Sequence, residues 1–173
     1  DHLSECADTF IGSATIRHLL THSSGLPGWR GFYEQLRPDG AIPSSAGGRE
    51  QAKRAMLRLI RSETQVYERG TRSLYSDLGF MLLGFIIERV SGQSLSEYFL
   101  DHIVYPLGEP QIGFILPGQH RAFSNSLDAD MGGVAPTEID QWRGHLLCGE
   151  VHDQNAAALG GEAGHAGLFG TVD

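Results

Sequence analysis

An apolar stretch, residues 78–87, directly follows the tripeptide Tyr75-Ser76-Asp77 and constrains the fold more than any other part of the chain. Its length and nearly all-apolar composition predict a helix over residues 77–90 that is buried in the centre of the domain. Asp77 is predicted to be the N-cap, because a carboxylate can accept hydrogen bonds from the first free amides of a helix. A tyrosine held beside such a cap can present its hydroxyl to a reaction centre. Taken alone, the tripeptide is better explained as a buried aromatic next to a cap, because three residues are a weak motif.

The remaining sequence predicts a mainly α-helical chain with little sheet. Apolar side chains recur at helical spacing in residues 48–62, and Ser94 with Glu97 forms a capping box that opens another helix. Further helices are predicted over residues 15–23, 48–62, about 94–106 and about 153–159. We also predict a loop over residues 28–48, irregular structure over 108–136, and a short strand over 168–171 that joins a sheet supplied by sequence outside residues 1–173.

The formal net charge of −8 argues against a nucleic-acid partner, because phosphate binding needs a cationic face. On the helix predicted at 48–62, the cations lie opposite the apolar stripe and are expected to form a solvated face rather than an anion site. These residues are Arg49, Lys53, Arg54, Arg58 and Arg61. No stretch reaches the roughly 18 apolar residues that cross a bilayer, so no membrane span is predicted. Residues 1–15 show no signal-peptide pattern, and the compartment is left open.

The cysteines and histidines are the candidate metal ligands in this sequence. Cys6 and Cys148 are far apart in sequence and could either pair or remain thiols, and no Cys-x-x-Cys motif is present to form a thiolate zinc site. His145, His152 and His165 could be drawn into a metal site with Asp153, but their spacing matches no zinc motif. We therefore predict histidines bonded to backbone groups, with no metal and no other cofactor.

Several segments together resemble the penicillin-recognising serine hydrolases, which include class C-type β-lactamases, D,D-peptidases and related esterases. The resemblance is strongest over residues 14–108, is weaker over the irregular residues 109–133, and returns over residues 134–173. The segments that carry it are residues 15–27, 75–92, 96–99, 105–108, 133–138, 142–144, 149–153 and 163–169. In that family the active site lies between a helical region and an α/β sandwich. The resemblance implies that residues 1–173 form the helical portion of the β-lactamase/transpeptidase-like fold, with the sandwich largely missing.

Of the three catalytic motifs in that family, the chain holds the middle one, since Tyr75-Ser76-Asp77 corresponds to Tyr-x-Asn. The nucleophile motif Ser-x-x-Lys is absent, because Lys53 is the only lysine and no serine lies three residues before it. The tripeptide His165-Ala166-Gly167 fits the third motif by its letters, but its neighbours match a family segment upstream of that motif. The chain is therefore expected to be an interior piece of a longer hydrolase and to be inactive alone.

By resemblance, Tyr75 shuttles a proton between the nucleophile and the leaving group, while the lysine of the first motif lowers the pKa of the phenol. Without that lysine, Tyr75 is expected to stay protonated in this chain. Asp77 departs from the asparagine of the family. A carboxylate can only accept hydrogen bonds and repels a substrate carboxylate, so Asp77 argues against a β-lactam or peptide-carboxylate substrate and leaves ester or amide hydrolysis open.

The resemblance also places three residues on the wall of the cleft as substrate-binding side chains, namely Trp142, His152 and His165. It makes the helix that carries His18 and His22 a structural segment. The predicted function is part of a serine hydrolase that forms an acyl-enzyme on a small-molecule or peptide-like amide or ester.

Two alternatives remain open from the sequence. The first is a non-catalytic penicillin-binding-like domain that binds a partner or a cell-wall fragment, for which the only support is Asp77. The second is a metal-dependent hydrolase that uses the histidines. In the β-lactamase-like fold that the resemblance implies, the face of the chain toward the missing sandwich should expose apolar side chains. Such a face could support self-association.

Overall fold

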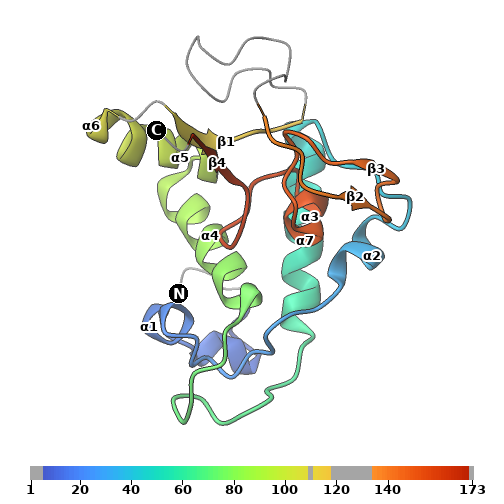
Figure 1. The fold of residues 1–173 in the computed structure, drawn as a ribbon. Helices are drawn as coiled ribbons and strands as arrows, with labels where there is room; N and C mark the ends of the chain where they lie inside the picture. The colour runs from blue at the N-terminus through green and yellow to red at the C-terminus, as the bar shows by residue number, and fades with distance from the viewer. Residues whose placement is uncertain (1–5, 109–110, 118–133, 172–173) are drawn as a thin grey trace.

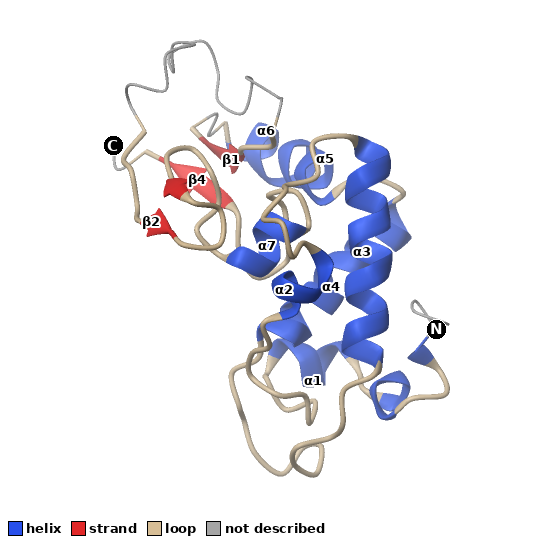
Figure 2. Ribbon diagram, turned by 90° about the vertical axis from the view of Figure 1, so that its right-hand side faces the viewer, coloured by secondary structure: helices blue, strands red, loops and turns tan. Residues whose placement is uncertain are grey.

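The computed structural model describes residues 6–108, 111–117 and 134–171. This part of the chain is mainly α-helical, as predicted, with two small two-stranded sheets (Figures 1 and 2). The helices are α1 (Ile16–Leu20), α2 (Phe32–Leu36), α3 (Ala46–Arg61), α4 (Asp77–Ser91), α5 (Leu95–Phe99), α6 (Tyr105–Leu107) and α7 (Gln154–Ala158). The strands are β1 (Ile112–Phe114), β2 (Ile139–Asp140), β3 (His145–Leu146) and β4 (Leu168–Gly170).

The two longest helices, α3 and α4, run in opposite directions and are joined by residues 62–76 (Figure 1). Met56 and Ile60 of α3 are completely buried, as are Leu78, Met81 and Leu82 of α4. These side chains belong to one hydrophobic core, and burying each of them contributes about 1.5–3 kcal/mol. The core therefore fixes the N-terminal half of α4, which follows Tyr75 directly.

The N-cap of α4 is Ser76 and not Asp77, so the prediction for Asp77 is wrong by one residue. The Ser76 hydroxyl accepts a hydrogen bond from the Gly79 amide at 3.2 Å and donates one to the carbonyl oxygen of Pro27 at 2.7 Å. Ser76 is buried, and a hydroxyl can make both bonds there, whereas an ionised carboxylate could not donate. Asp77 occupies the first helical position, where its negative charge complements the helix dipole.

The second half of α4 is less buried than its apolar sequence predicts. From Phe85 onward the helix is half-buried or exposed, and the Val90 side chain is 62% exposed. Complete burial of the helix is therefore a wrong prediction for this half. The helix ends where Gly92 adopts a left-handed backbone conformation at φ 74°, which glycine adopts without steric cost.

The other predicted helices are present, and one helix was missed. The structure has α1, α3, α5 and α7 within or close to the predicted ranges, and Ser94 and Glu97 form the predicted capping box of α5. The missed helix, α2, lies inside the predicted loop. It is held by Asn155, whose side chain accepts from the Tyr33 amide at 2.9 Å and donates to the Arg30 carbonyl oxygen at 2.8 Å. A five-residue helix that depends on such a distant contact leaves little local signal.

The helix that begins with α5 was predicted to end at Pro106 but continues to Leu107. A π-turn at Leu100–Val104 joins α5 to α6, and Pro106 stands in the first turn of α6. The π-turn shifts the register of the helix, because the Tyr105 amide donates to the Leu100 carbonyl oxygen five residues before it, and Pro106 follows directly after this shift. Gly108, in a left-handed conformation at φ 70°, ends α6.

The predicted strand at 168–171 is present as β4, but its partner lies within this chain. β4 pairs antiparallel with β1, with Ile112 opposite Gly170 and Phe114 opposite Leu168. The prediction that its sheet comes from sequence outside residues 1–173 is therefore wrong for this pairing. Residues 109–110 and 118–133 of the predicted irregular region lie outside the described residues, and the part that is described includes the unpredicted strand β1.

The hairpin of β2 and β3 was also not predicted. A buried ion pair holds it, with Arg143 Nη2 at 3.0 Å from Asp140 Oδ2. The same guanidinium donates to the carbonyl oxygens of Val151 and His152 at 2.8 and 2.9 Å. Arg143 thereby joins the hairpin to the segment that precedes α7. In the part of the chain that the structure describes, no single helix is long and apolar enough to cross a membrane.

Candidate active site around Tyr75

Tyr75 lies at the surface with its backbone held on both sides by His22. The side chain of Tyr75 is 66% exposed, so it is not the buried aromatic that the tripeptide alone suggested. The Leu74 amide donates to the His22 carbonyl oxygen at 2.8 Å, and the Ser76 amide donates to His22 Nδ1 at 3.0 Å. Bonds to the residues before and after Tyr75 therefore fix where the phenol leaves the chain.

The ring of His22 also packs against the phenol. Its centroid lies 4.7 Å from that of Tyr75 and 4.9 Å from that of Phe80 in α4. His22 is the one non-glycine residue in the described chain with a positive φ, at 54°, and its carbonyl oxygen also accepts from the Tyr67 hydroxyl at 2.7 Å. Because Nδ1 accepts a hydrogen bond, the neutral ring carries its proton on Nε2. The contact of His22 with Tyr75 could not be read from the sequence.

The charge around Tyr75 is negative. The carboxylate of Asp77 raises the pKa of the Tyr75 phenol, and burial, a hydrogen bond to Asp77 and the charge of Asp153 act in the same direction. A negative charge disfavours the phenolate, so Tyr75 is protonated at neutral pH. This direction agrees with the expectation for a chain without a lysine beside the motif.

Lys53 is bound elsewhere. Its ammonium group lies 2.6 Å from Glu88 Oε1 and 2.8 Å from Glu162 Oε1, with 12% of the side chain exposed. Glu88 stands eleven residues after Asp77 in α4, roughly 16 Å along the helix axis at 1.5 Å per residue. The prediction that Lys53 belongs to a solvated face is therefore wrong, although Arg54 of the same helix is well exposed. Lys53 lines a groove of about 750 Å³ between α3 and α4, which Tyr75 does not line.

His165 and Asp153 form a second pair of interacting side chains. His165 Nε2 lies 2.9 Å from Asp153 Oδ1, and the His165 side chain is only 2% exposed. Asp153 is the N-cap of α7, where Oδ1 accepts from the Ala156 amide at 2.7 Å. Burial alone would raise the pKa of Asp153, but the hydrogen bond and charge of His165 and two backbone amides hold it below its ordinary value.

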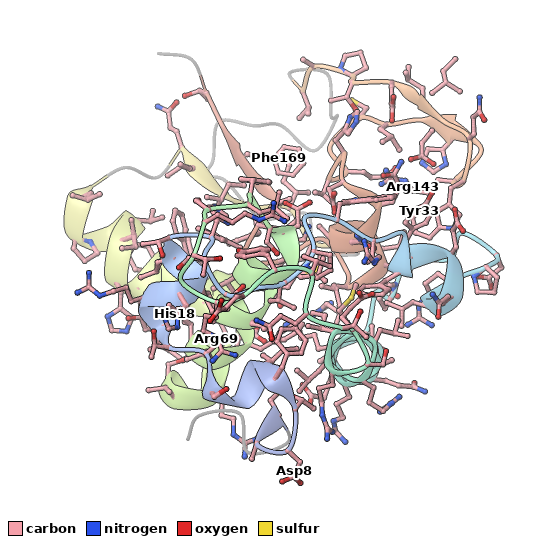
Figure 3. All side chains as sticks on the ribbon, turned by 90° about the horizontal axis from the view of Figure 1, so that it is seen from below. Asp8, His18, Tyr33, Arg69, Arg143 and Phe169 are labelled. Atoms are coloured by element: carbon pink, nitrogen blue, oxygen red, sulfur yellow. The ribbon has the colours of Figure 1, made fainter. Side chains whose placement is uncertain are left out.

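The other two predicted cleft residues, Trp142 and His152, contact other parts of the chain. The Trp142 indole donates to the Arg37 carbonyl oxygen at 2.8 Å, and its ring lies 5.0 Å from that of Tyr33. Figure 3 shows Tyr33 next to Arg143, away from His18. His152 is exposed and lies 3.3 Å from Glu138. In the described residues these two side chains contact Arg37, Tyr33 and Glu138, and their role in substrate binding stays a prediction.

Metal and disulfide chemistry have little support in the described residues. Within residues 6–108, 111–117 and 134–171, no cluster of three or more histidine, cysteine or acidic side chains could hold a metal ion. Cys6 is buried in the core, and Cys148 is half-buried with its thiol donating to the Val134 carbonyl oxygen at 3.2 Å. No disulfide joins these two residues.

The mainly helical fold and the exposed tyrosine before α4 are features shared with the β-lactamase family. A sequence profile of the family described as Beta-lactamase matches residues 1–173, and the chain belongs to this family.

Two curated relatives make the comparison more specific. A candidate D-alanyl-D-alanine carboxypeptidase of Escherichia coli (strain K12) is 34% identical over 171 residues, which is 94% of this chain and 37% of the relative. An N-acetylmuramyl-L-alanine amidase of Bacillus subtilis (strain 168) is 34% identical over 177 residues, which is 96% of this chain and 37% of the relative. The chain therefore spans well under half the length of either protein.

Solved structures show the same fold. An octameric penicillin-binding protein homologue from Pyrococcus abyssi superposes with a TM-score of 0.56 at 27% identity, over 92% of this chain and 32% of its own. A penicillin binding protein from Bacillus halodurans superposes with a TM-score of 0.60 at 22% identity, over 93% of this chain and 43% of its own, which bears on the fold alone.

Proposed function

We propose that this chain forms the tyrosine side of the active site of a serine hydrolase that cleaves an amide or ester through an acyl-enzyme. The observation that carries the proposal is Tyr75, an exposed phenol whose backbone neighbours are both bonded to His22 directly before the buried half of α4. Tyr75 is the proton carrier between the nucleophile and the leaving group. Asp77 lies beside it at the position that asparagine has in the family motif.

The nucleophile is proposed to lie in sequence outside residues 1–173. No serine in this chain precedes a lysine by three residues, and the only lysine is bound to Glu88 and Glu162. The chain also covers only 37% of its curated relatives. We therefore propose that residues 1–173 are not catalytically competent alone.

An amide is the favoured substrate class. The names of the Escherichia coli and Bacillus subtilis relatives denote a carboxypeptidase and an amidase, and both of these enzyme types cleave amide bonds. The Asp77 carboxylate repels a substrate carboxylate placed next to Tyr75. We therefore propose a peptide-like amide whose carboxylates lie away from this end of the site, with His165, His152 and Trp142 as candidate binding residues.

Labelling with a fluorophosphonate tests the proposal, because this probe reacts with activated serines. The longer protein that contains this sequence should be labelled on the serine of a Ser-x-x-Lys motif, located by mass spectrometry, and the 173-residue chain should not be labelled. Label on a serine of residues 1–173 would show that the nucleophile had been misplaced. An unlabelled longer protein would overturn the hydrolase and favour the non-catalytic binding domain, for which Asp77 is the specific observation.

We also propose that the chain self-associates through its exposed apolar residues. Ile16 and Leu20, four residues apart on α1, are 47% and 55% exposed, and Leu74 next to Tyr75 is 36% exposed. The Pyrococcus abyssi homologue is described as octameric. Light scattering should give a mass above one chain, and Leu20→Lys should lower that mass. A monomer at all accessible concentrations would refute the proposal.

A further inference from the structure

His22 has a backbone conformation that few residues adopt. Its φ is 54°, in the left-handed region, which glycine adopts without steric cost and asparagine adopts more readily than most residues. Most other side chains are strained there. A residue held in this region beside a candidate site is a reason to look for a role of its side chain.

His22 holds the chain on both sides of Tyr75. Its carbonyl oxygen accepts from the amide of Leu74, the residue before, at 2.8 Å, and its Nδ1 accepts from the amide of Ser76, the residue after, at 3.0 Å. The ring also lies against the phenol, with the two centroids 4.7 Å apart. The two hydrogen bonds differ in one respect, because a carbonyl oxygen does not titrate near neutral pH and an imidazole nitrogen does.

The bond at Nδ1 exists only while the ring is neutral. With its proton on Nε2, the ring offers Nδ1 as an acceptor, but the charged ring carries a proton on both nitrogens and has no acceptor left. The Ser76 amide would then face an N–H group. Ser76 is almost completely buried, and a buried donor without a partner is costly. Protonation of His22 therefore removes the anchor on the residue after Tyr75.

The start of α4 has hydrogen bonds that do not depend on His22. Ser76 Oγ donates to the Pro27 carbonyl oxygen at 2.7 Å, and the Asp77 amide donates to the Gly28 carbonyl oxygen at 2.9 Å. Amide, hydroxyl and carbonyl groups do not change charge between about pH 5 and 8. Loss of the Nδ1 bond should therefore loosen Tyr75 and leave α4 in place.

We propose that His22 is a positioning residue for Tyr75 that acts only as the neutral ring. Nδ1 anchors the residue after Tyr75, and a proton that binds Nδ1 from solvent breaks this anchor and loosens the phenol. The part of the inference that concerns catalysis rests on the proposed hydrolase. The elements packed around His22 carry the following titratable or charged groups: Arg17 and His18 of α1, Tyr67, Arg72 and Tyr75 of the segment before α4, and Asp77 of α4.

NMR titration of the 173-residue chain between about pH 8 and 5 tests the anchor. The His22 ring signals report protonation, the Ser76 amide reports the hydrogen bond, and nuclear Overhauser contacts between the rings of His22 and Tyr75 report the place of the phenol. All three should change at one pH. Corrected for its intrinsic rate, exchange of the Ser76 amide should become roughly two- to tenfold faster in acid, as expected for one net hydrogen bond.

The Gly79 amide, which donates to Ser76 Oγ, is the internal control and should keep its protection throughout the titration. A Ser76 amide and a Tyr75 ring that do not respond while His22 titrates overturn the proposal. A His22 ring that stays neutral down to about pH 5 overturns the release of the phenol.

Two substitutions separate the acceptor from the backbone conformation. His22→Asn tolerates the positive φ and places a non-titrating amide oxygen near the position of Nδ1, so the Ser76 amide should stay protected at every pH. His22→Gly also tolerates the φ but has no acceptor, so exchange should be fast at every pH. The matched control is His18→Asn, because His18 Nδ1 bonds the Thr15 amide, and it should leave the response of Tyr75 unchanged.

The comparison of His22→Asn with the wild type decides even if His22→Gly does not fold. The same acid response of the Ser76 amide in both would mean that the proton binds elsewhere, and would overturn the proposal. A pH-independent amide in His22→Asn beside a responsive wild type supports it.

In the longer hydrolase, the pH profile of kcat provides the catalytic readout. The wild-type kcat should fall at the pH at which NMR shows His22 becoming protonated, and His22→Asn should retain most of its kcat there. His22→Gly should lower kcat roughly 10–10²-fold at every pH with a smaller change in KM, because a misplaced catalytic group slows the reaction by such factors. An unchanged kcat in His22→Gly, or the same acid limb in the wild type and His22→Asn, overturns the positioning role. If the fluorophosphonate fails to label the longer protein, the proposed hydrolase fails, while the titrations of the 173-residue chain still decide the anchor.

Discussion

Replacing Lys53 by methionine tests the ion cluster that joins α3 to α4 and to the turn before His165. Lys53 is bonded to two carboxylates, and the side chains of Glu88 and Glu162 are 17% and 1% exposed. Each carboxylate also accepts one amide bond from the start of α5, Glu88 from Leu95 at 2.9 Å and Glu162 from Ser96 at 3.0 Å. The variant would leave two carboxylates close together with amide donors but without a cation.

The expected loss of folding stability is large because the Glu162 side chain is almost completely buried. Removing one partner of a buried ion pair costs about 3–5 kcal/mol, which is a large part of the total stability of a small domain. Burial alone would raise the pKa of Glu162, but the charge and hydrogen bond of Lys53 and the bonds from Ser96 hold it below 4.5. This contribution is present above pH 4.5 and is lost as pH falls through the folded pKa. Lys53→Met should therefore cost most at neutral pH and progressively less in acid.

Guanidinium chloride unfolding at neutral pH and at about pH 4 measures the loss of stability in Lys53→Met and how that loss changes with pH. Arg54→Met is the matched control, since it removes the exposed pair of Arg54 with Glu50 from the same helix and should cost about 0–1 kcal/mol. Equal losses in Lys53→Met and Arg54→Met, or a loss from Lys53→Met that does not shrink in acid, would refute the reasoning. Above neutral pH the dependence of stability on pH has the opposite sign. Burial alone would lower the pKa of Lys53, but Glu162 and Glu88 raise it above 10.5, so the cluster persists until pH exceeds that raised value.

Four further substitutions have defined outcomes. Ser76→Ala should lower the free energy of unfolding in urea by about 1–2 kcal/mol, because the hydroxyl caps α4 and also donates to a buried carbonyl oxygen. Gly164→Ala should cost about 1–3 kcal/mol in the same assay, because its methyl group would overlap the backbone of α4. Gly47→Ala in α3 meets no neighbouring atom and should stabilise by roughly 0.5–1 kcal/mol. In the proposed longer hydrolase, Tyr75→Phe should lower kcat by roughly 10²–10⁴-fold in a turnover assay, and an unchanged kcat would remove Tyr75 from the mechanism.

Local signals account for the parts of the fold that were predicted correctly. Helix α3 follows from apolar spacing, α5 from the capping box of Ser94 and Glu97, and α7 from a short segment that begins at a capping aspartate. The parts that were missed depend on distant contacts. α2 needs Asn155, the β2–β3 hairpin needs the buried Arg143–Asp140 pair, and β1 pairs with a strand more than fifty residues away. No pattern within a short window encodes such contacts.

The candidate site also combines residues that a local motif predicts with residues that depend on distant contacts. Tyr75 and Asp77 are predicted as site residues because they stand together in a motif at the start of an apolar helix. The side chains that set their environment come from elsewhere, His22 from the end of α1 and Asp153 from the N-cap of α7. The prediction for Lys53 is wrong for a related reason. Helical spacing places Lys53 on a polar face, but its ammonium group binds Glu162, which lies more than one hundred residues later in the sequence. A charged residue on a polar face is buried when a distant partner compensates its charge, and sequence spacing contains no record of that partner.

The charge at Tyr75 also limits what can complete the site. Two carboxylates, Asp77 and Asp153, disfavour the phenolate, and the described chain places no lysine beside them. If Tyr75 carries the proton as proposed, a cation from sequence outside residues 1–173 would favour the phenolate that these carboxylates disfavour. A lysine ammonium from a Ser-x-x-Lys motif would meet two opposite charges, which raise its pKa and leave little of the unprotonated amine at neutral pH. Tyr75 would then act with a charged lysine neighbour, and the balance among Asp77, Asp153 and that lysine would decide whether the phenol accepts or donates the proton.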